Sequence, residues 1–362
     1  MSETCLYHST QLNINFYKAD LNYNFMNAIN KTIQDDDRSW EKVIMKYNHP
    51  KLSKSIWQIC NSLIPYIFLW YLMYRSLAYS YWVTLLLSIV ASGFLIRIFI
   101  IFHDCGHRSF FVSANANKII GMIMGIIAFT PYDRWHNQHR THHATSGNLD
   151  KRGIGDVWTM TVDEYTKSSF WNRFFYRAFR NPFIMFTVGP LLVIFFQNRI
   201  TTKNMIRAER LNVYFTNFMV LLIAGLISLL IGIKAYLLIQ IPVILISHSM
   251  GLWLFYVQHQ FDDVYWERGN KWDYKISAIQ GSSFLKLPAI FQWFTGNIGF
   301  HHVHHLSSRI PNYYLSKCHY ENDVFKDVKP IVFFSTFKSL TRGLWDEASH
   351  RMISFRKITA SS

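Results

Sequence analysis

The chain has 362 residues, of which half are hydrophobic and 17% aromatic, and it carries a formal net charge of +15. Such a charge would suit a nucleic-acid partner, but the chain has no nucleic-acid-binding motif and its basic residues flank long apolar runs, so nucleic acid is excluded as a partner. Four cysteines without a CxxC pair also exclude a disulfide framework, a zinc ribbon and an iron–sulfur cluster.

The N-terminal segment, residues 1–56, is polar and basic. It lacks the short apolar stretch that precedes a signal-peptide cleavage site, so no signal peptide is expected. Two apolar runs follow, at residues 57–77 and 81–102. At about 1.5 Å per residue, each is long enough to cross a hydrocarbon core of about 30 Å. Arg97, near the end of the second run, is expected to extend its side chain to the membrane interface.

The first histidine window, HDCGH at 103–107, directly follows the second run. Residues three or four apart share one face of a helix, so His103 and His107 are predicted to aim at one point. The next apolar stretch, 119–130, is too short to cross a membrane and is expected to lie at the interface. The second window, HRTHH at 139–143, repeats the helical spacing with His139, His142 and His143.

A further apolar stretch, 183–197, is interrupted by Pro190 and is also expected to be interfacial. Residues 211–232 and 236–257 contain no Asp, Glu, Lys or Arg and are predicted to be two more spans. The third window, HHVHH at 301–305, follows them. If the three windows build one site they must share one side of the membrane, which four spans allow and a fifth span at 183–197 would not.

The orientation follows from the positive-inside rule, because Lys and Arg are concentrated before the first span and in the 198–210 connection. We therefore expect a multi-pass protein of the cell membrane, with the three windows and both termini cytoplasmic. The simplest partition is one domain, residues 1–362, with a cytoplasmic cap formed by residues 103–210 and 258–362. The predicted fold is an all-α integral membrane protein with about four transmembrane helices, interfacial helices and a helical cap that holds a two-metal site.

Eight imidazoles in three convergent windows exceed the need of one zinc ion, which takes about four ligands, so two metal ions are predicted. Imidazole suits zinc, copper, iron and nickel, which leaves the metal open. A carboxylate-bridged centre is not favoured, because the Glu-x-x-His pattern occurs once, at Glu347 and His350. Neutral ligands beside apolar spans favour oxygen chemistry on a lipid, since a dry groove protects a reactive site.

Several stretches carry a family resemblance, among them IRIFIIFHDCGHRSFF, HHATSGNLDKRG, WLFYVQHQFDD and QWFTGNIGFHHVHHLS. With these windows, residues 61–355 resemble the membrane fatty-acid desaturases, and within them the Bacillus-type acyl-lipid (phospholipid, delta-5) desaturases. The resemblance implies two iron ions, O₂ as co-substrate, and a cis double bond introduced into saturated acyl chains of membrane phospholipids. It also implies the nine ligands His103, His107, His139, His142, His143, His259, His301, His304 and His305.

Other polar residues near the windows are not assigned as metal ligands. Asp104, Asp156 and Asn297 are expected to orient metal-bound rings by accepting their outer N–H groups. His302 is expected to point away from the metals, and His136 is not assigned as a ligand. His248 lies inside a span, where either a functional role or a bond to a neighbouring helix is compatible with the sequence.

Electrons must come from outside, because the chain shows no haem-binding domain, flavin fingerprint or cysteine cluster. Ferredoxin or flavodoxin is the donor that the resemblance implies, and a basic surface suits an acidic partner. Two alternatives stay open: a lipid hydroxylase or ketolase on the same scaffold, and a non-enzymatic metal-binding membrane protein. The second is disfavoured because transport sites lie near the membrane midplane and not at one face.

Overall fold

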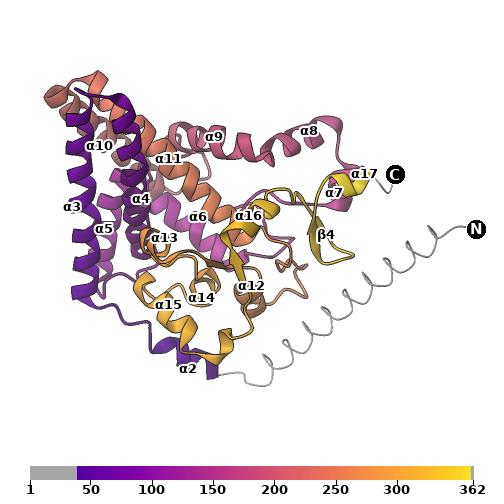
Figure 1. Cartoon of the computed structure of the whole chain (residues 1–362). Coiled ribbons are helices and arrows are strands. Elements are labelled where there is room, and N and C mark those ends of the chain that lie inside the picture. Colours follow the sequence, from indigo (N-terminus) through magenta and orange to yellow (C-terminus); the bar gives the residue numbers. More distant parts are fainter. Residues whose placement is uncertain (1–38, 360–362) are drawn as a thin grey trace, which may run out of the picture.

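Four long helices dominate the computed structural model, which describes residues 39–359 (Figure 1). They are α3 (Leu52–Ser76), α4 (Tyr81–Gly106), α10 (Arg207–Ile231) and α11 (Ile233–His259). Each is long and apolar enough to cross a membrane, as predicted for the four runs. The most apolar part of α4 is 61% buried and that of α10 only 6%, so α4 is central and α10 is left to face lipid.

These helices extend beyond the predicted spans. α3 begins at Leu52 and not at residue 57, α4 continues to Gly106, and α11 continues to His259. The helices are longer than the apolar runs because apolar composition marks only the part of a helix that needs lipid. His103 and His259 lie on the last turns of α4 and α11.

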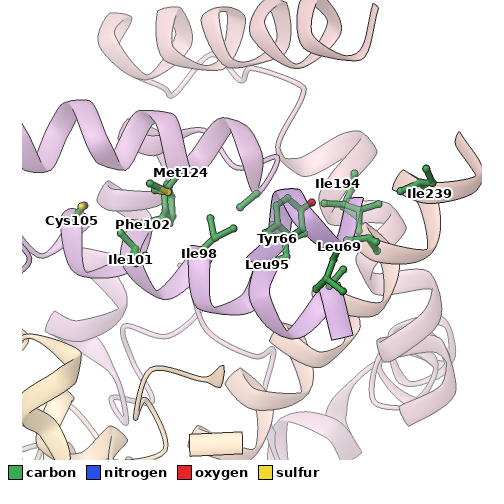
Figure 2. Close-up of a cluster of buried hydrophobic side chains, with 14 of the residues drawn as sticks. Tyr66, Leu69, Leu95, Ile98, Ile101, Phe102, Cys105, Met124, Ile194 and Ile239 are labelled. Atoms are coloured by element: carbon green, nitrogen blue, oxygen red, sulfur yellow. The ribbon is translucent and has the colours of Figure 1, made fainter. Parts of the chain in front are cut away.

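The core of the bundle forms around α4. Figure 2 shows Leu95, Ile98 and Phe102 along this helix, with Tyr66 of α3 and Met124 of α5 (Ala114–Ile127) among the side chains that accompany them. The predicted interfacial stretch 119–130 thus packs against the membrane bundle as part of α5.

Arg97 is buried within the protein, whereas its side chain was expected to extend to the membrane interface. Its side chain is 7% exposed, and its guanidinium donates to the Asn61 side chain and to the carbonyl of Trp293. The group also lies over the Trp293 ring, 4.0 Å from its centroid. Polar partners inside the protein therefore satisfy this cation, and they fasten α13 (Ala289–Phe294) to α4.

The stretch 183–197 forms α9 (Pro182–Leu192) and a π-helical turn, η1 (Val193–Gln197), preceded by α8 (Phe170–Phe179). α8 and the α9–η1 segment are bent by 84° relative to each other. α8 exposes aromatic side chains, including Phe170, Trp171, Phe174 and Phe175. Aromatic rings of this kind suit a membrane interface.

Short helices make up most of the cap: α2 (Ser39–Met45), α6 (Tyr132–Thr145), α7 (Val162–Lys167), α12 (Tyr274–Gln280), α14 (His301–Leu306), α15 (Asn312–Tyr320), η2 (Asp323–Phe325), α16 (Phe333–Ser339) and α17 (Arg356–Thr359). Five strands of two or three residues add to the predicted helical fold: β1 (Met160–Thr161), β2 (Phe284–Lys286), β3 (Pro330–Val332), β4 (Leu344–Asp346) and β5 (Arg351–Ile353). β1 pairs parallel to β4 and β4 antiparallel to β5, while β2 pairs parallel to β3. These pairs tie the C-terminal segment to the rest of the cap.

Candidate metal centre

Four helices bring the histidines together. His103 lies in the last turn of α4 and His107 directly follows that helix, while α6 carries the second window. His259 is the last residue of α11, and α14 consists almost entirely of the third window. All nine predicted ligands therefore converge at one end of the helix bundle.

The nine rings divide into two groups of possible metal ligands. Within each group, one nitrogen per residue lies within 4.8 Å of the nitrogens of all the others. The first group holds His103, His107, His139, His143 and His304, and the second holds His142, His259, His301 and His305. The second and third windows each contribute to both groups, so the two sites are interlocked through α6 and α14.

The spacing between the ring nitrogens fits ligands of a shared ion. The Nε2 atom of His139 lies 3.1 Å from that of His103 and 3.1 Å from that of His143. In the second group, His259 Nε2 lies 3.1 Å from His142 Nε2 and 2.9 Å from His301 Nε2. With a metal–nitrogen bond of about 2.1 Å, ligands at right angles are about 3.0 Å apart and tetrahedral ligands about 3.4 Å apart. The observed spacing is therefore short enough for the rings of each group to hold one ion.

The tautomers in the second group give an independent test of fit. His259 Nδ1 must donate to the carbonyl of Gly281, 3.1 Å away, because a carbonyl cannot donate. His142 Nδ1 lies 2.6 Å from the Asp156 carboxylate. When both rings are neutral and donate from Nδ1, their bare Nε2 lone pairs face each other at 3.1 Å, which is repulsive without a cation between them. The donor set fits a metal ion.

Two of the predicted carboxylates lie beside ligand rings. Asp156 accepts from His142, and Asp104 Oδ1 lies 3.1 Å from His103 Nδ1. The second Asp104 oxygen accepts from the backbone N–H of Asn312 at 2.7 Å and from its side-chain amide at 2.9 Å. Each carboxylate thus fixes a ring whose other nitrogen points into a histidine group.

Asn297 does not occupy the predicted position beside a ring. Its backbone has a φ of 58°, and its side-chain amide donates to the carbonyl of Asn312 at 3.3 Å. The left-handed turn directs the side chain toward α15, so the spacing of four residues to His301 did not bring the two side chains together. Asn297 supports Asn312, which in turn binds Asp104.

Burial favours the neutral form of five of the ligand histidines. The pKa values of His139, His143 and His304 lie well below the ordinary histidine value. The largest cause is desolvation by burial, and the second is repulsion from neighbouring rings when these are protonated. The same causes lower the pKa of His301 and His305. Neutral imidazoles are the form that binds metal ions, so burial prepares these residues as ligands.

The other histidines lie outside both groups. His302 is fully buried and its Nε2 lies 2.9 Å from Nδ1 of His319, so it points away from the metal groups as predicted. His136 stacks on Tyr132, with ring centroids 6.2 Å apart. His248 Nδ1 donates to the carbonyl of Ile244, 3.0 Å away in its own helix.

Trp135 is a feature of the site that the sequence reasoning missed. Its ring stacks on that of His139, with centroids 4.3 Å apart, and lies 5.5 Å from that of His103. The signal was its position four residues before His139, which places both on one face of α6.

Comparison with known proteins gives the chain its family. A family model described as "Fatty acid desaturase" matches residues 79–335. A fatty acid desaturase of Bacillus subtilis is 46% identical over 328 residues, which cover 91% of this chain and 93% of that protein. Two Synechocystis proteins are each 25% identical: an sn-1 oleoyl-lipid 12-desaturase over 68% of this chain and 70% of its own length, and an sn-1 acyl-lipid omega-3 desaturase (ferredoxin) over 61% and 62%. With four membrane-length helices and two histidine groups in its structure, this chain is a membrane oxidoreductase that belongs to the fatty acid desaturase family.

Proposed function

We propose that this enzyme desaturates saturated acyl chains esterified in membrane phospholipids, using O₂ and a di-iron centre to form a cis double bond. The observation that carries the proposal is the pair of buried histidine groups at the end of the four membrane-length helices. Relatives named as acyl-lipid desaturases support an esterified substrate. The overall reaction removes two hydrogens from adjacent methylenes and consumes one O₂, two electrons and two protons, giving two waters.

Iron is proposed because breaking an unactivated C–H bond with O₂ requires a metal that changes oxidation state, which zinc cannot do. The five and four neutral imidazoles leave the charge of both ions uncompensated and provide a ligand set without a bridging carboxylate. Bound iron would supply the one-electron steps and the activation of O₂.

The protein's own residues position the ligands and keep water out. Asp104, Asp156 and the Gly281 carbonyl hold the Nδ1 atoms of three rings, so that the Nε2 atoms face the metal positions. Seven of the nine predicted ligands are less than a tenth exposed and the other two are partly exposed. A buried, preorganised site of this kind protects a reactive centre from side reactions.

We further propose that the windows and both termini face the cytoplasm of a bacterial cell membrane. The Lys and Arg bias of the flanking loops supports this orientation. Tyr79, in the turn between α3 and α4, is 83% exposed, and Lys326 is an exposed cap residue. In a background without Cys5 and Cys60, a membrane-impermeant maleimide should label Tyr79→Cys in intact cells and Lys326→Cys only after lysis. The reverse pattern would contradict the orientation.

The reaction is tested by expressing the chain in a bacterium that makes only saturated acyl chains, together with a ferredoxin and its reductase. Mass spectrometry with double-bond location should find new monounsaturated chains in the phospholipids. His304→Ala should abolish them and His350→Ala, at an exposed histidine outside both groups, should not. An absence of unsaturated product would contradict the proposal, and hydroxylated or keto chains would point to the alternative chemistry.

The electron donor is proposed to be a ferredoxin or a flavodoxin. One Synechocystis relative carries ferredoxin in its name, which supports the first of these. The formal net charge of +15 suits an acidic protein of either kind.

A further inference from the structure

Three exposed arginines stand beside the three histidine windows. Arg108 directly follows His107 and Arg140 directly follows His139, while Arg309 comes four residues after His305. Within residues 39–359, none of the three forms an ion pair. We call Arg108, Arg140 and Arg309 the arginine face.

The chain places the three arginines next to ligands of the five-histidine group. Arg108 follows His107 and comes two residues after Gly106, where a Cβ atom would lie 3.9 Å from His136 Nδ1. Arg140 follows His139 and comes four residues after His136, so Arg140 and His136 share one face of α6. Arg309 lies between α14, which carries His304, and α15.

The backbone at Arg108 adopts a strained conformation. Its φ is 55°, a left-handed value that favours glycine at the end of a helix. The turn closes α4, because the N–H of Arg108 donates to the Cys105 carbonyl and that of Ser109 to the Asp104 carbonyl, both at 3.0 Å. A non-glycine residue here costs stability. Arg108 therefore places an exposed positive charge next to a ligand, although glycine at this position would make the fold more stable.

An aromatic side chain connects this face with the ligands. Trp135 is partly exposed, and its ring contacts those of His139 and His103. Gly106, two residues before Arg108, packs so closely that a Cβ atom there would lie 2.8 Å from the Trp135 ring. The end of α4 and the indole are thus in direct contact. Because electron tunnelling weakens steeply with distance, a route through this packed ring is favoured over one through solvent.

We propose that the arginine face docks an acidic one-electron carrier protein and that electrons reach the five-histidine group through Trp135. This inference rests on the proposed function. Each docked carrier is oxidised by one electron, so two docking events supply the two electrons that one turnover requires. A protein is favoured over a lipid phosphate because Arg140 lies on α6 and Arg309 in the α14–α15 connection of the cap, while Arg108 directly follows the end of α4. The exposed aromatic rings that suit a membrane are on α8. Figure 1 shows α8 away from α14 and α15.

The first test measures docking, not turnover. Purified enzyme in nanodiscs is titrated with an oxidised plant-type [2Fe–2S] ferredoxin at low and at physiological salt. The triple variant Arg108→Glu, Arg140→Glu, Arg309→Glu should slow association by about tenfold or more at low salt. The triple Arg→Lys variant should retain fast association. A control with the same change in net charge, Lys271→Glu, Lys286→Glu, Lys326→Glu, reverses exposed lysines elsewhere in the cap and should have a much smaller effect.

A second test uses the strain at Arg108. Arg108→Gly should raise the melting temperature, because glycine adopts the left-handed conformation freely, and at the same time weaken ferredoxin binding. A stability gain without any loss of binding would overturn the role of Arg108.

A third test addresses the route through Trp135. Trp135→Leu should leave the ferredoxin dissociation constant unchanged but slow the reoxidation of reduced ferredoxin in a stopped-flow experiment at least about tenfold, and Trp135→Phe should restore part of the rate. Metal content is measured for both variants, so that a lost ion is not mistaken for a lost route. Equal rates in all three proteins at equal metal content would overturn it.

The outcomes separate the docking proposal from the proposed function. If both charge-reversal triples weaken binding equally, or if only the binding of phosphatidylglycerol vesicles depends on the arginines, the docking proposal is wrong even when unsaturated lipids are made. If ferredoxin binds at the arginine face but no unsaturated lipid forms, the proposed function fails instead.

Discussion

At the scale of single residues, neighbouring histidines in one window serve different groups. His142 and His143 belong to separate groups, and so do His304 and His305. Successive residues of an α-helix point about 100° apart, since 3.6 residues make one turn. Adjacent residues of α6 and of α14 can therefore bind different ions. The HxxHH spacing allows each of these helices to contribute ligands to both histidine groups.

The Asp156 carboxylate should determine how firmly the second group holds its ion. Asp156→Asn replaces an acceptor for His142 Nδ1 with a weaker one, and changes of this kind cost about 10- to 100-fold in metal affinity. Metal content after dialysis against a weak chelator, measured by mass spectrometry, should fall toward one ion per chain. Asp163→Asn removes an exposed carboxylate that pairs with Lys167 and serves as the control. Equal metal loss in both variants would rule out a specific role for Asp156.

The His302–His319 pair should make stability depend on pH. Burial lowers the pKa of His302 to about 3 and that of His319 to about 4, whereas both groups titrate near 6.5 in the unfolded chain. Below pH 6.5 the unfolded state binds more protons than the folded state, so the free energy of unfolding decreases as the pH falls from about 6.5 to about 4. Above pH 6.5 the contribution is constant.

This dependence is measured as the melting temperature in detergent at pH 7.5 and pH 5.0. His319→Gln keeps a hydrogen-bonding side chain but removes one titrating group, so the variant should lose less stability between the two pH values than the wild type. A variant that loses as much as the wild type would show that this pair does not control the acid response.

At the scale of elements, the sequence predicted the long helices well and the short ones poorly. Composition alone located α3, α4, α10 and α11, because a membrane span needs a continuous apolar surface. The strands β1 to β5 and helix α13 were not predicted, since their residues have no period of their own and depend on partners far along the chain. Likewise, spacing predicted that eight histidines converge but not that they divide into two groups, which depends on how four helices are rotated against one another.

Close packing between α5 and α6 is expected to be sensitive to a single methyl group. A Cβ atom at Gly121 would lie 2.2 Å from the Tyr132 ring and 3.1 Å from the Cβ of Cys105. Gly121→Ala should therefore destabilise the protein by about 1–3 kcal/mol through overpacking. Gly225→Ala, in α10, meets nothing within 4 Å and should be neutral or slightly stabilising. Melting temperatures of the two variants in the same detergent compare them, and equal shifts would contradict the packing argument.

At the scale of the whole molecule, the site joins parts of the chain that are far apart in sequence. The five-histidine group takes ligands from α4, α6 and α14, and the four-histidine group takes them from α6, α11 and α14. Membrane helices and cap helices thus meet at the same two positions. Bound metal ions would link α4 and α11 of the membrane bundle to the cap, in addition to the short strands that tie the C-terminal segment.

Removal of metal should therefore destabilise the whole protein and not only abolish activity. Without a cation, the Nε2 lone pairs of His142 and His259 face each other at 3.1 Å, and the link between spans and cap is lost. For a free ion at about 1,000 times its dissociation constant, the lost binding corresponds to about 4 kcal/mol. A strong chelator should lower the melting temperature of the wild type, and two equivalents of Fe(II) per chain should restore it. His304→Ala, which lacks one ligand of the five-histidine group, should show a smaller drop and need less metal for recovery. A metal-free protein that melts at the same temperature as the loaded one would show that the ions do not hold the two parts together.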